Sequence, residues 1–157
     1  MKKKLRLIHE RLIQRKNSLA VAESCTGGQL SALLTSLPGS SEYFLLGAVT
    51  YQNRTKEMFL DIPRTILTKF GAVSSPVAIL MASNIRKKTR ADFSLGITGI
   101  AGPKGGSLPK PVGTVYICLS KKGKNTCRRF NFHGSRMNIR KKSVEKALDL
   151  LCASLSP

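Results

Sequence analysis

The apolar positions in the first forty residues switch from helical spacing to strand spacing and back. Residues 2–16 carry an apolar side chain every three or four positions between charges, which predicts a basic amphipathic helix. The run LAVA at 19–22 predicts a short buried strand. Leucines then recur at helical spacing from 30 to 37. We expect this second helix to start near Gly27 and to end at Pro38-Gly39.

The middle of the chain combines one strand pattern with several helical segments. YFLLGAVTY at 43–51 is rich in the aromatic and β-branched residues that favour strands, and a short helix is expected around 56–60. PRTILTKFG at 63–71 has a helical pattern that ends on a glycine suited to a C-cap. Ser75-Pro76 is expected to supply the N-cap and the first residue of a longer helix. Its inner face would consist of Val77, Leu80, Met81 and Ile85.

The last third reads as strands followed by a closing helix. FSLGITG at 93–99 predicts a buried strand, and a Gly/Pro-rich loop follows at 99–113. TVYICLS and TCRRFNFH predict a hairpin that turns at KKGKN, and apolar spacing predicts a helix from about Met137. The expected order is α-β-α-β-α-α-β-β-β-α. We therefore predict the fold class α/β, as a single-domain layered sandwich over 1–157 with helices flanking a mixed β-sheet.

Basic residues outnumber acidic ones by 27 to 8, which gives a formal net charge of +19. Most of the basic residues lie in three segments, 1–16, 86–90 and 121–146. Such a charge attracts polyanions and anionic small molecules. However, the chain has no Trp, few aromatic residues and no recognised nucleic-acid motif, so charge is the only support for nucleic acid as a ligand. We do not expect nucleic acid to be the main partner.

Two further classes are excluded by the sequence. No apolar stretch approaches the roughly 20 residues of a membrane-spanning helix, and charges interrupt the N-terminal segment where a signal peptide would need an apolar run. We expect a cytoplasmic protein with no membrane partner. The four cysteines form no C-x-x-C pair and only two histidines are present, so we expect reduced thiols, no metal site and no cofactor.

The stretch AESCTGGQL at 22–30 raises the question of a nucleophile. Ser24 follows a buried strand and precedes a helix, where small polar residues are also typical of an ordinary turn. The two histidines stand in isolated contexts, which argues against a Ser-His-Asp triad. A buried lysine with a lowered pKa can activate a serine instead. Lys56 is the candidate because it lies just beyond an apolar strand, although a solvated position in a first helical turn remains the alternative.

The segment GITGIAGPKGG begins where a buried strand ends. Ligands bind at strand ends in α/β sheets, and glycines allow the backbone to approach a ligand closely. Thr98 and Gly99 are therefore candidate binding residues, with a plain glycine-rich loop as the alternative.

Five segments together resemble one known family. AESCTGG, GAVTYQNRTK, GAVSSPVA, GITGIAGPKGG and KPVGTVYICL occur in the order and at the spacing of the C-terminal domain of the CinA (competence/damage-inducible) family. The resemblance covers roughly residues 5–155. It implies an amidohydrolase of pyridine nucleotide metabolism that converts nicotinamide mononucleotide into nicotinate mononucleotide and ammonia, as a homo-oligomer. Since the family's molybdopterin-binding-like domain is not seen, we expect the stand-alone form.

The resemblance also implies roles for individual residues. Ser24 corresponds to the nucleophile, Lys56 to its general base, and Tyr51 to a motif tyrosine counted with the catalytic residues. The implied substrate contacts come from the same motifs and from the late segment GSRMNIR: Cys25, Thr26, Gly27, Gly47, Thr98, Gly99, Arg136 and Arg140. In this reading the backbone N–H groups of Cys25 and Thr26 stabilise the oxyanion at a helix N-terminus, and the arginines bind the substrate phosphate.

Two positions depart from the family pattern. Ser135 stands where the family usually has an acidic residue, and Ser75-Pro76 stands where acidic residues usually follow GAVS. If the missing acid normally orients an arginine, phosphate binding is weakened. The alternative function is therefore a catalytically degenerate relative that acts as a basic nucleotide- or nucleic-acid-binding accessory protein.

Overall fold

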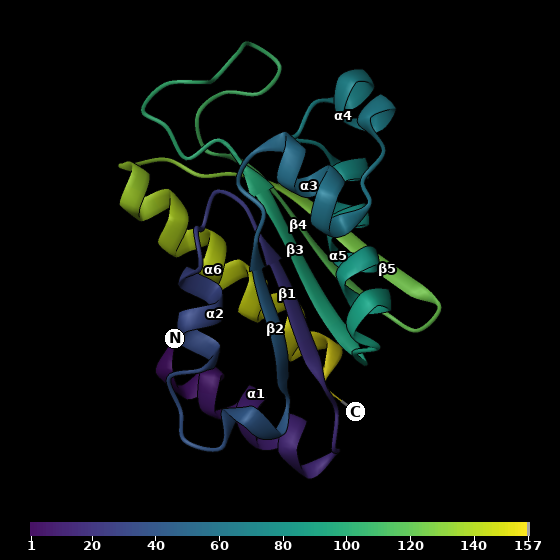
Figure 1. Cartoon of the computed structure of the whole chain (residues 1–157). Coiled ribbons are helices and arrows are strands. Elements are labelled where there is room, and N and C mark those ends of the chain that lie inside the picture. The colour runs from purple at the N-terminus through teal and green to yellow at the C-terminus, as the bar shows by residue number, and fades with distance from the viewer. Residues whose placement is uncertain (157) are drawn as a thin grey trace.

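Five strands form one mixed sheet in the computed structural model, which describes residues 1–156 (Figure 1). The spatial order is β2-β1-β3-β4-β5. β2, β1 and β3 are parallel, whereas β4 pairs antiparallel with both β3 and β5. The strand bounds are β1 (Leu19–Glu23), β2 (Phe44–Val49), β3 (Phe93–Gly99), β4 (Thr114–Lys121) and β5 (Lys124–Asn131). The predicted α/β class, with helices flanking a mixed sheet, is confirmed.

Helices cover both faces of this sheet (Figure 1). α1, α2 and α6 pack on one face, and α3, α4 and α5 pack on the other. Their bounds are α1 (Lys2–Gln14), α2 (Gln29–Leu34), α3 (Asn53–Leu60), α4 (Arg64–Phe70), α5 (Ser75–Thr89) and α6 (Arg136–Ser154), with a 3₁₀ turn at Ser40–Glu42. Within residues 1–156, no helix is both long enough and apolar enough to cross a bilayer.

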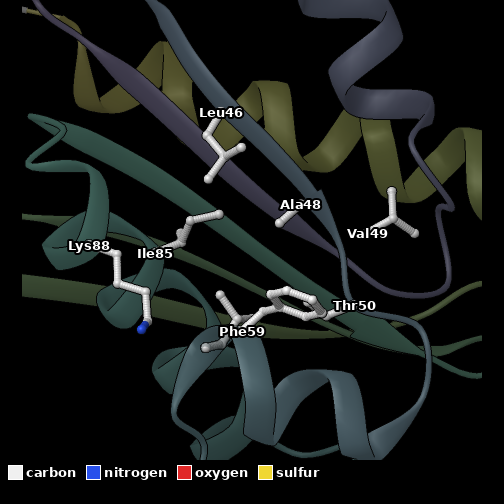
Figure 2. Close-up of a pocket in the computed structure, with 8 residues that line it drawn as sticks. Leu46, Ala48, Val49, Thr50, Phe59, Ile85 and Lys88 are labelled. Atoms are coloured by element: carbon white, nitrogen blue, oxygen red, sulfur yellow. The ribbon is translucent and has the colours of Figure 1, made fainter.

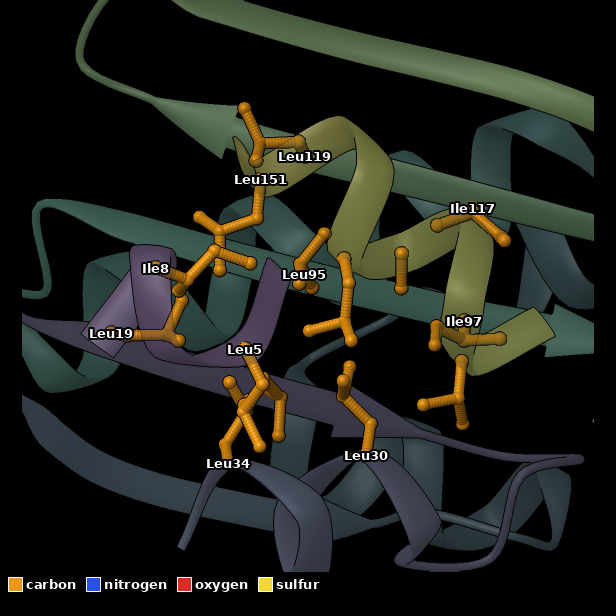
Figure 3. Close-up of a cluster of buried hydrophobic side chains, with 14 of the residues drawn as sticks. Leu5, Ile8, Leu19, Leu30, Leu34, Leu95, Ile97, Ile117, Leu119 and Leu151 are labelled. Atoms are coloured by element: carbon orange, nitrogen blue, oxygen red, sulfur yellow. The ribbon is translucent and has the colours of Figure 1, made fainter. Parts of the chain in front are cut away.

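The interior strand β1 is buried on both faces, which explains its largely apolar sequence. Leu19 and Val21 face the larger core, shown in Figure 3, where leucines and isoleucines of α1, α2 and α6 meet those of the sheet. Ala20 and Ala22 point to the opposite face and pack with α5. The small side chains on this second face leave room for α5 to lie close to the sheet.

Helix α5 touches the backbone of β3 at Gly96. A Cβ atom at this position would lie 2.6 Å from both the carbonyl oxygen of Ala78 and the amide nitrogen of Ala82. The Ser94 hydroxyl also donates to the Ala82 carbonyl at 2.6 Å. The packing therefore allows only glycine at residue 96, and it fixes the position of α5 on the sheet.

Both boundaries of the second helix differ from the sequence predictions. The second helix begins at Gln29 rather than near Gly27, because Gly27 and Gly28 adopt left-handed backbone angles (φ 59° and 91°) that a helix cannot contain. This helix also ends early, at Leu34, where Thr35 and Ser36 donate their hydroxyls to backbone carbonyls.

The other two differences concern the helices after β2. The expected order counts two helices between β2 and β3, although three helical segments were expected there, at 56–60, at 63–71 and from Ser75. The structure has three helices, because Asp61 (φ 49°) and Pro63 separate α3 from α4. The longer helix, α5, has its N-cap at Ser74, so Ser75 is its first residue and Pro76 its second.

Candidate active site

The site lies where the three parallel strands end. β1 ends at Glu23 and is followed by Ser24, β2 ends at Val49, and β3 ends at Gly99. Because these strands are parallel neighbours, their carboxyl ends meet at one edge of the sheet. Figure 1 shows α3, the loop after β3 and the start of α6 at the same edge.

Ser24 and Lys56 form a buried pair at this edge. Lys56 Nζ lies 3.2 Å from Ser24 Oγ, although the two residues are 32 positions apart. Lys56 is 1% exposed and Ser24 is 8% exposed. Lys56 lies in the first turn of α3, and its side chain is covered by the protein. The alternative interpretation, a lysine that faces solvent, is therefore wrong.

Burial changes the protonation of this lysine. Removal from water disfavours the ammonium form and lowers the pKa of Lys56 from 10.5 to about 8. Within residues 1–156 no carboxylate lies within ion-pair distance of Lys56 to oppose this effect. A substantial neutral fraction therefore exists near neutral pH.

Two backbone carbonyls orient the amine. Lys56 Nζ donates to the carbonyl oxygens of Thr50 at 2.7 Å and of Tyr51 at 3.1 Å. A neutral amine has two N–H groups and one lone pair. When the two carbonyls occupy the N–H groups, the lone pair is left for the hydroxyl of Ser24.

A buried carboxylate holds the turn that carries Ser24. Glu23 is fully buried and accepts hydrogen bonds from the backbone N–H groups of Gly28, Leu30 and Ser31 and from the Ser31 hydroxyl. It thereby caps the start of α2 from the strand that precedes it. The sequence reading missed this role. The available signal was a glutamate that directly follows the apolar run at 19–22.

Ser24 is separated from α2 by this turn, so the predicted position directly at a helix N-terminus is wrong. The turn still leaves donors beside the serine. Within residues 1–156, the backbone N–H groups of Cys25 and Thr26 have no oxygen acceptor. Cys25 is 5% exposed and burial raises the pKa of its thiol to about 12, so it stays protonated and is no competing nucleophile.

Two arginines of α6 reach across to the site. Arg136 donates to the Tyr51 hydroxyl and to the Gly102 carbonyl, both at 2.8 Å. Arg140 donates to the Thr26 carbonyl through Nη2 at 2.7 Å and through Nε at 3.3 Å. The arginines therefore tie the Ser24 turn, Tyr51 and the loop after β3 to one helix. Tyr51 itself is 53% exposed.

Ser135 takes a structural role at the start of this helix. Its hydroxyl accepts from the backbone N–H of Asn138 at 3.3 Å, which makes it the N-cap of α6. Arg136 is oriented by Tyr51 and Gly102, without an acidic neighbour at position 135.

The remaining predicted contacts lie close by but are engaged within the protein. Thr98 is 1% exposed and donates its hydroxyl to the Ala72 carbonyl at 2.8 Å. A Cβ atom at Gly99 would lie 2.7 Å from Val115 Cγ2, and one at Gly47 would overlap the Ser31 side chain. Packing alone thus requires both glycines, and substrate contact at these three positions stays a prediction.

Beside the Ser–Lys pair lies an apolar pocket of about 300 Å³ (Figure 2). It is lined by Leu46, Ala48, Val49, Thr50, Phe59, Leu60, Ile85 and Lys88. Neither Ser24 nor Lys56 belongs to the lining, and Lys88 Nζ is paired with Asp61 Oδ2 at 2.6 Å. This pocket is apolar, and Lys88, its one charged lining residue, is already paired with Asp61. It therefore does not suit a nucleotide phosphate, and we place the reaction at Ser24 and Lys56 instead.

The described residues contain no group of three or more His, Cys, Asp or Glu side chains placed to hold a metal ion. Fold and site together define the class: an α/β protein with a buried Ser–Lys pair at the carboxyl edge of the parallel part of its sheet.

Sequence comparison identifies the family. Residues 2–155 match the CinA C-terminal domain, and the chain belongs to this family. It is 50% identical over 145 residues to a CinA-like protein of Desulfotalea psychrophila, covering 92% of this chain and 35% of that protein. It is also 50% identical over 144 residues to a putative competence-damage inducible protein of Moorella thermoacetica, with the same coverage. The chain therefore spans about a third of the length of these relatives.

Solved structures agree with this assignment. The competence/damage inducible protein CihA of Agrobacterium tumefaciens superposes with a TM-score of 0.94 at 37% identity, covering 97% of this chain and 93% of that chain. A competence or damage-inducible protein of Enterobacter asburiae gives a TM-score of 0.94 at 32% identity, covering 98% and 97% of the two chains. The resemblance noted in the sequence is confirmed at the level of the family.

Proposed function

We propose that the chain is an amidohydrolase that deamidates nicotinamide mononucleotide to nicotinate mononucleotide and ammonia. The observation that carries the reaction class is the 3.2 Å contact between Lys56 Nζ and Ser24 Oγ in a buried site. A serine next to a lysine of lowered pKa can perform acyl transfer without histidine or metal. The choice of substrate rests on the family resemblance.

The reaction begins when neutral Lys56 takes the proton of Ser24. Oγ attacks the amide carbon, and the carbonyl oxygen becomes an oxyanion that the N–H groups of Cys25 and Thr26 stabilise. The Lys56 ammonium then gives its proton to the amide nitrogen, which leaves as ammonia. An ester of Ser24 remains, and Lys56 activates the water that hydrolyses it.

Arg136 and Arg140 are the proposed phosphate ligands. A guanidinium has five N–H donors, and the contacts to Gly102, Tyr51 and Thr26 use only two on each arginine. The remaining donors suit the oxygens of a phosphate. We assign Tyr51 to positioning Arg136, because its hydroxyl contacts that arginine while only its backbone carbonyl contacts Lys56.

An ammonia-release assay on the purified chain tests the substrate. We expect turnover of nicotinamide mononucleotide and, because the phosphate contacts are lost, a kcat/KM at least about tenfold lower for nicotinamide riboside. Ser24→Ala, compared with Ser36→Ala at an exposed position just after α2, distinguishes this activity from a contaminating amidase. No ammonia from the mononucleotide with folded protein would exclude the proposed substrate.

One observation keeps the accessory-protein alternative open. Helix α1 packs against α6, which brings the basic residues of 2–16 and 136–146 onto adjoining surfaces. The alternative predicts binding to single- or double-stranded DNA that persists near 150 mM salt and falls steeply as salt rises. Absence of binding at low salt would exclude it.

A further inference from the structure

Two cysteines lie opposite one another on the β4–β5 hairpin, whose strands are two and three positions away from β1 in the sheet. Cys118 and Cys127 are register partners, in the fourth pair counted from the two-residue turn at Lys122-Gly123. In an antiparallel hairpin, hydrogen-bonded and non-hydrogen-bonded residue pairs alternate, and the pair next to a two-residue turn is hydrogen-bonded. The fourth pair is therefore non-hydrogen-bonded, and its two Cα atoms lie about 4.5 Å apart. This separation lies within the range of disulfides.

Both thiols point to the same face of the sheet. Cys118 is fully buried against Ala78 and Ala82 of α5, and Cys127 packs half-buried against this cluster. Cys127 Sγ lies 4.0 Å from the carbonyl oxygen of Ser75, the first residue of α5. One thiol is therefore accessible from solvent, while its neighbour is shielded.

The surroundings assign different reactivities to the two thiols. The contact with Cys118 and the neighbouring Ser75 side chain lower the pKa of Cys127, and the contact with Cys127, together with burial, raises the pKa of Cys118. Cys127 is thus suited to attack first, and Cys118 to react second.

We propose that Cys118 and Cys127 form a thiol–disulfide exchange site that reacts with small-molecule disulfides such as oxidised glutathione. The Cys127 thiolate attacks one sulfur of the small disulfide, forms a mixed disulfide and releases one thiolate. Cys118 then loses its proton and attacks Cys127 Sγ, which releases the second thiolate and closes the protein disulfide. The protein loses two protons and two electrons, which the small disulfide gains as it is reduced to two thiols. This site does not depend on the proposed amidohydrolase activity.

Peptide mapping of the whole chain tests the proposal. The folded protein is incubated with oxidised glutathione, unfolded in N-ethylmaleimide and digested with trypsin. Lys121, Lys122 and Lys124 lie between the two cysteines, so their peptides separate unless a disulfide joins them. We expect a linked Cys118–Cys127 peptide that dithiothreitol separates.

Matched variants define the roles. Cys152→Ser removes another half-buried thiol and should leave the linked peptide unchanged. Cys118→Ala keeps a small apolar side chain against α5 and should stop at the mixed disulfide on Cys127. The proposal is overturned if wild-type protein accumulates a stable mixed disulfide on Cys127, if Cys127 stays unmodified while Cys152 reacts, or if either cysteine is linked to a different partner.

Discussion

The protonation of Lys56 sets the expected pH dependence of the reaction. With a pKa of about 8, Lys56 is neutral in about one molecule in ten at pH 7, against about one in 3,000 for the ordinary value of 10.5. Burial therefore increases the population of active base about 300-fold at this pH. Since only the neutral form accepts the Ser24 proton, kcat/KM should rise about fivefold from pH 7 to 8 and less than twofold above that.

The assay is ammonia release from nicotinamide mononucleotide at low substrate concentration between pH 7 and 9.5, a range above the second ionisation of a phosphate. Tyr51→Phe serves as the control, because removal of the phenol should leave the apparent pKa unchanged. A flat profile, or a rise that continues with unit slope to pH 9.5, would refute the assigned pKa and the role of Lys56 as the base.

Three further outcomes follow from the structure. In the folded state Lys56 loses its proton at lower pH than in the unfolded state, so the unfolded state binds more protons between about pH 8 and 10.5 and stability rises with pH. Urea unfolding should show this as about 1 kcal/mol between pH 7 and 9, absent in Lys56→Met. Glu23→Gln should cost about 2 kcal/mol, because an amide replaces a charged acceptor of four hydrogen bonds, whereas the exposed control Glu10→Gln should cost little. Arg140→Ala should raise KM for the mononucleotide about tenfold or more, and an unchanged KM in steady-state kinetics would remove it from the phosphate site.

The sheet was predictable in part because β1 and β3 are buried on both faces and therefore consist of nearly unbroken apolar runs. The ends of the helices were less predictable. The left-handed glycines 27 and 28 depend on backbone angles that apolar spacing does not encode, and the hydroxyls of Thr35 and Ser36 bind carbonyls where the leucine spacing continues. The sequence therefore predicted which helices and strands are present, but it placed some of their ends at the wrong residues.

The candidate site likewise has features that the sequence predicted and features that it did not. Ser24 and Lys56 were identified by their motifs, and the structure brings them into contact because β1 and β2 are parallel neighbours. The carbonyls that orient Lys56 belong to the backbone of Thr50 and Tyr51. Because every residue has a backbone carbonyl, the sequence does not indicate which of them will accept these hydrogen bonds. Glu23 was overlooked because an acid at a strand end resembles a solvated residue until the helix that it caps is seen.

The central claim, that Ser24 is activated by Lys56, is tested most directly by single-turnover ammonia release in Lys56→Met. Methionine keeps the length of the buried side chain but cannot accept a proton, and Lys87→Met on the exposed end of α5 is the matched control. We predict a rate at least about a thousandfold lower for Lys56→Met, with Lys87→Met unchanged. A folded Lys56→Met protein that releases ammonia within tenfold of the wild-type rate would contradict the account.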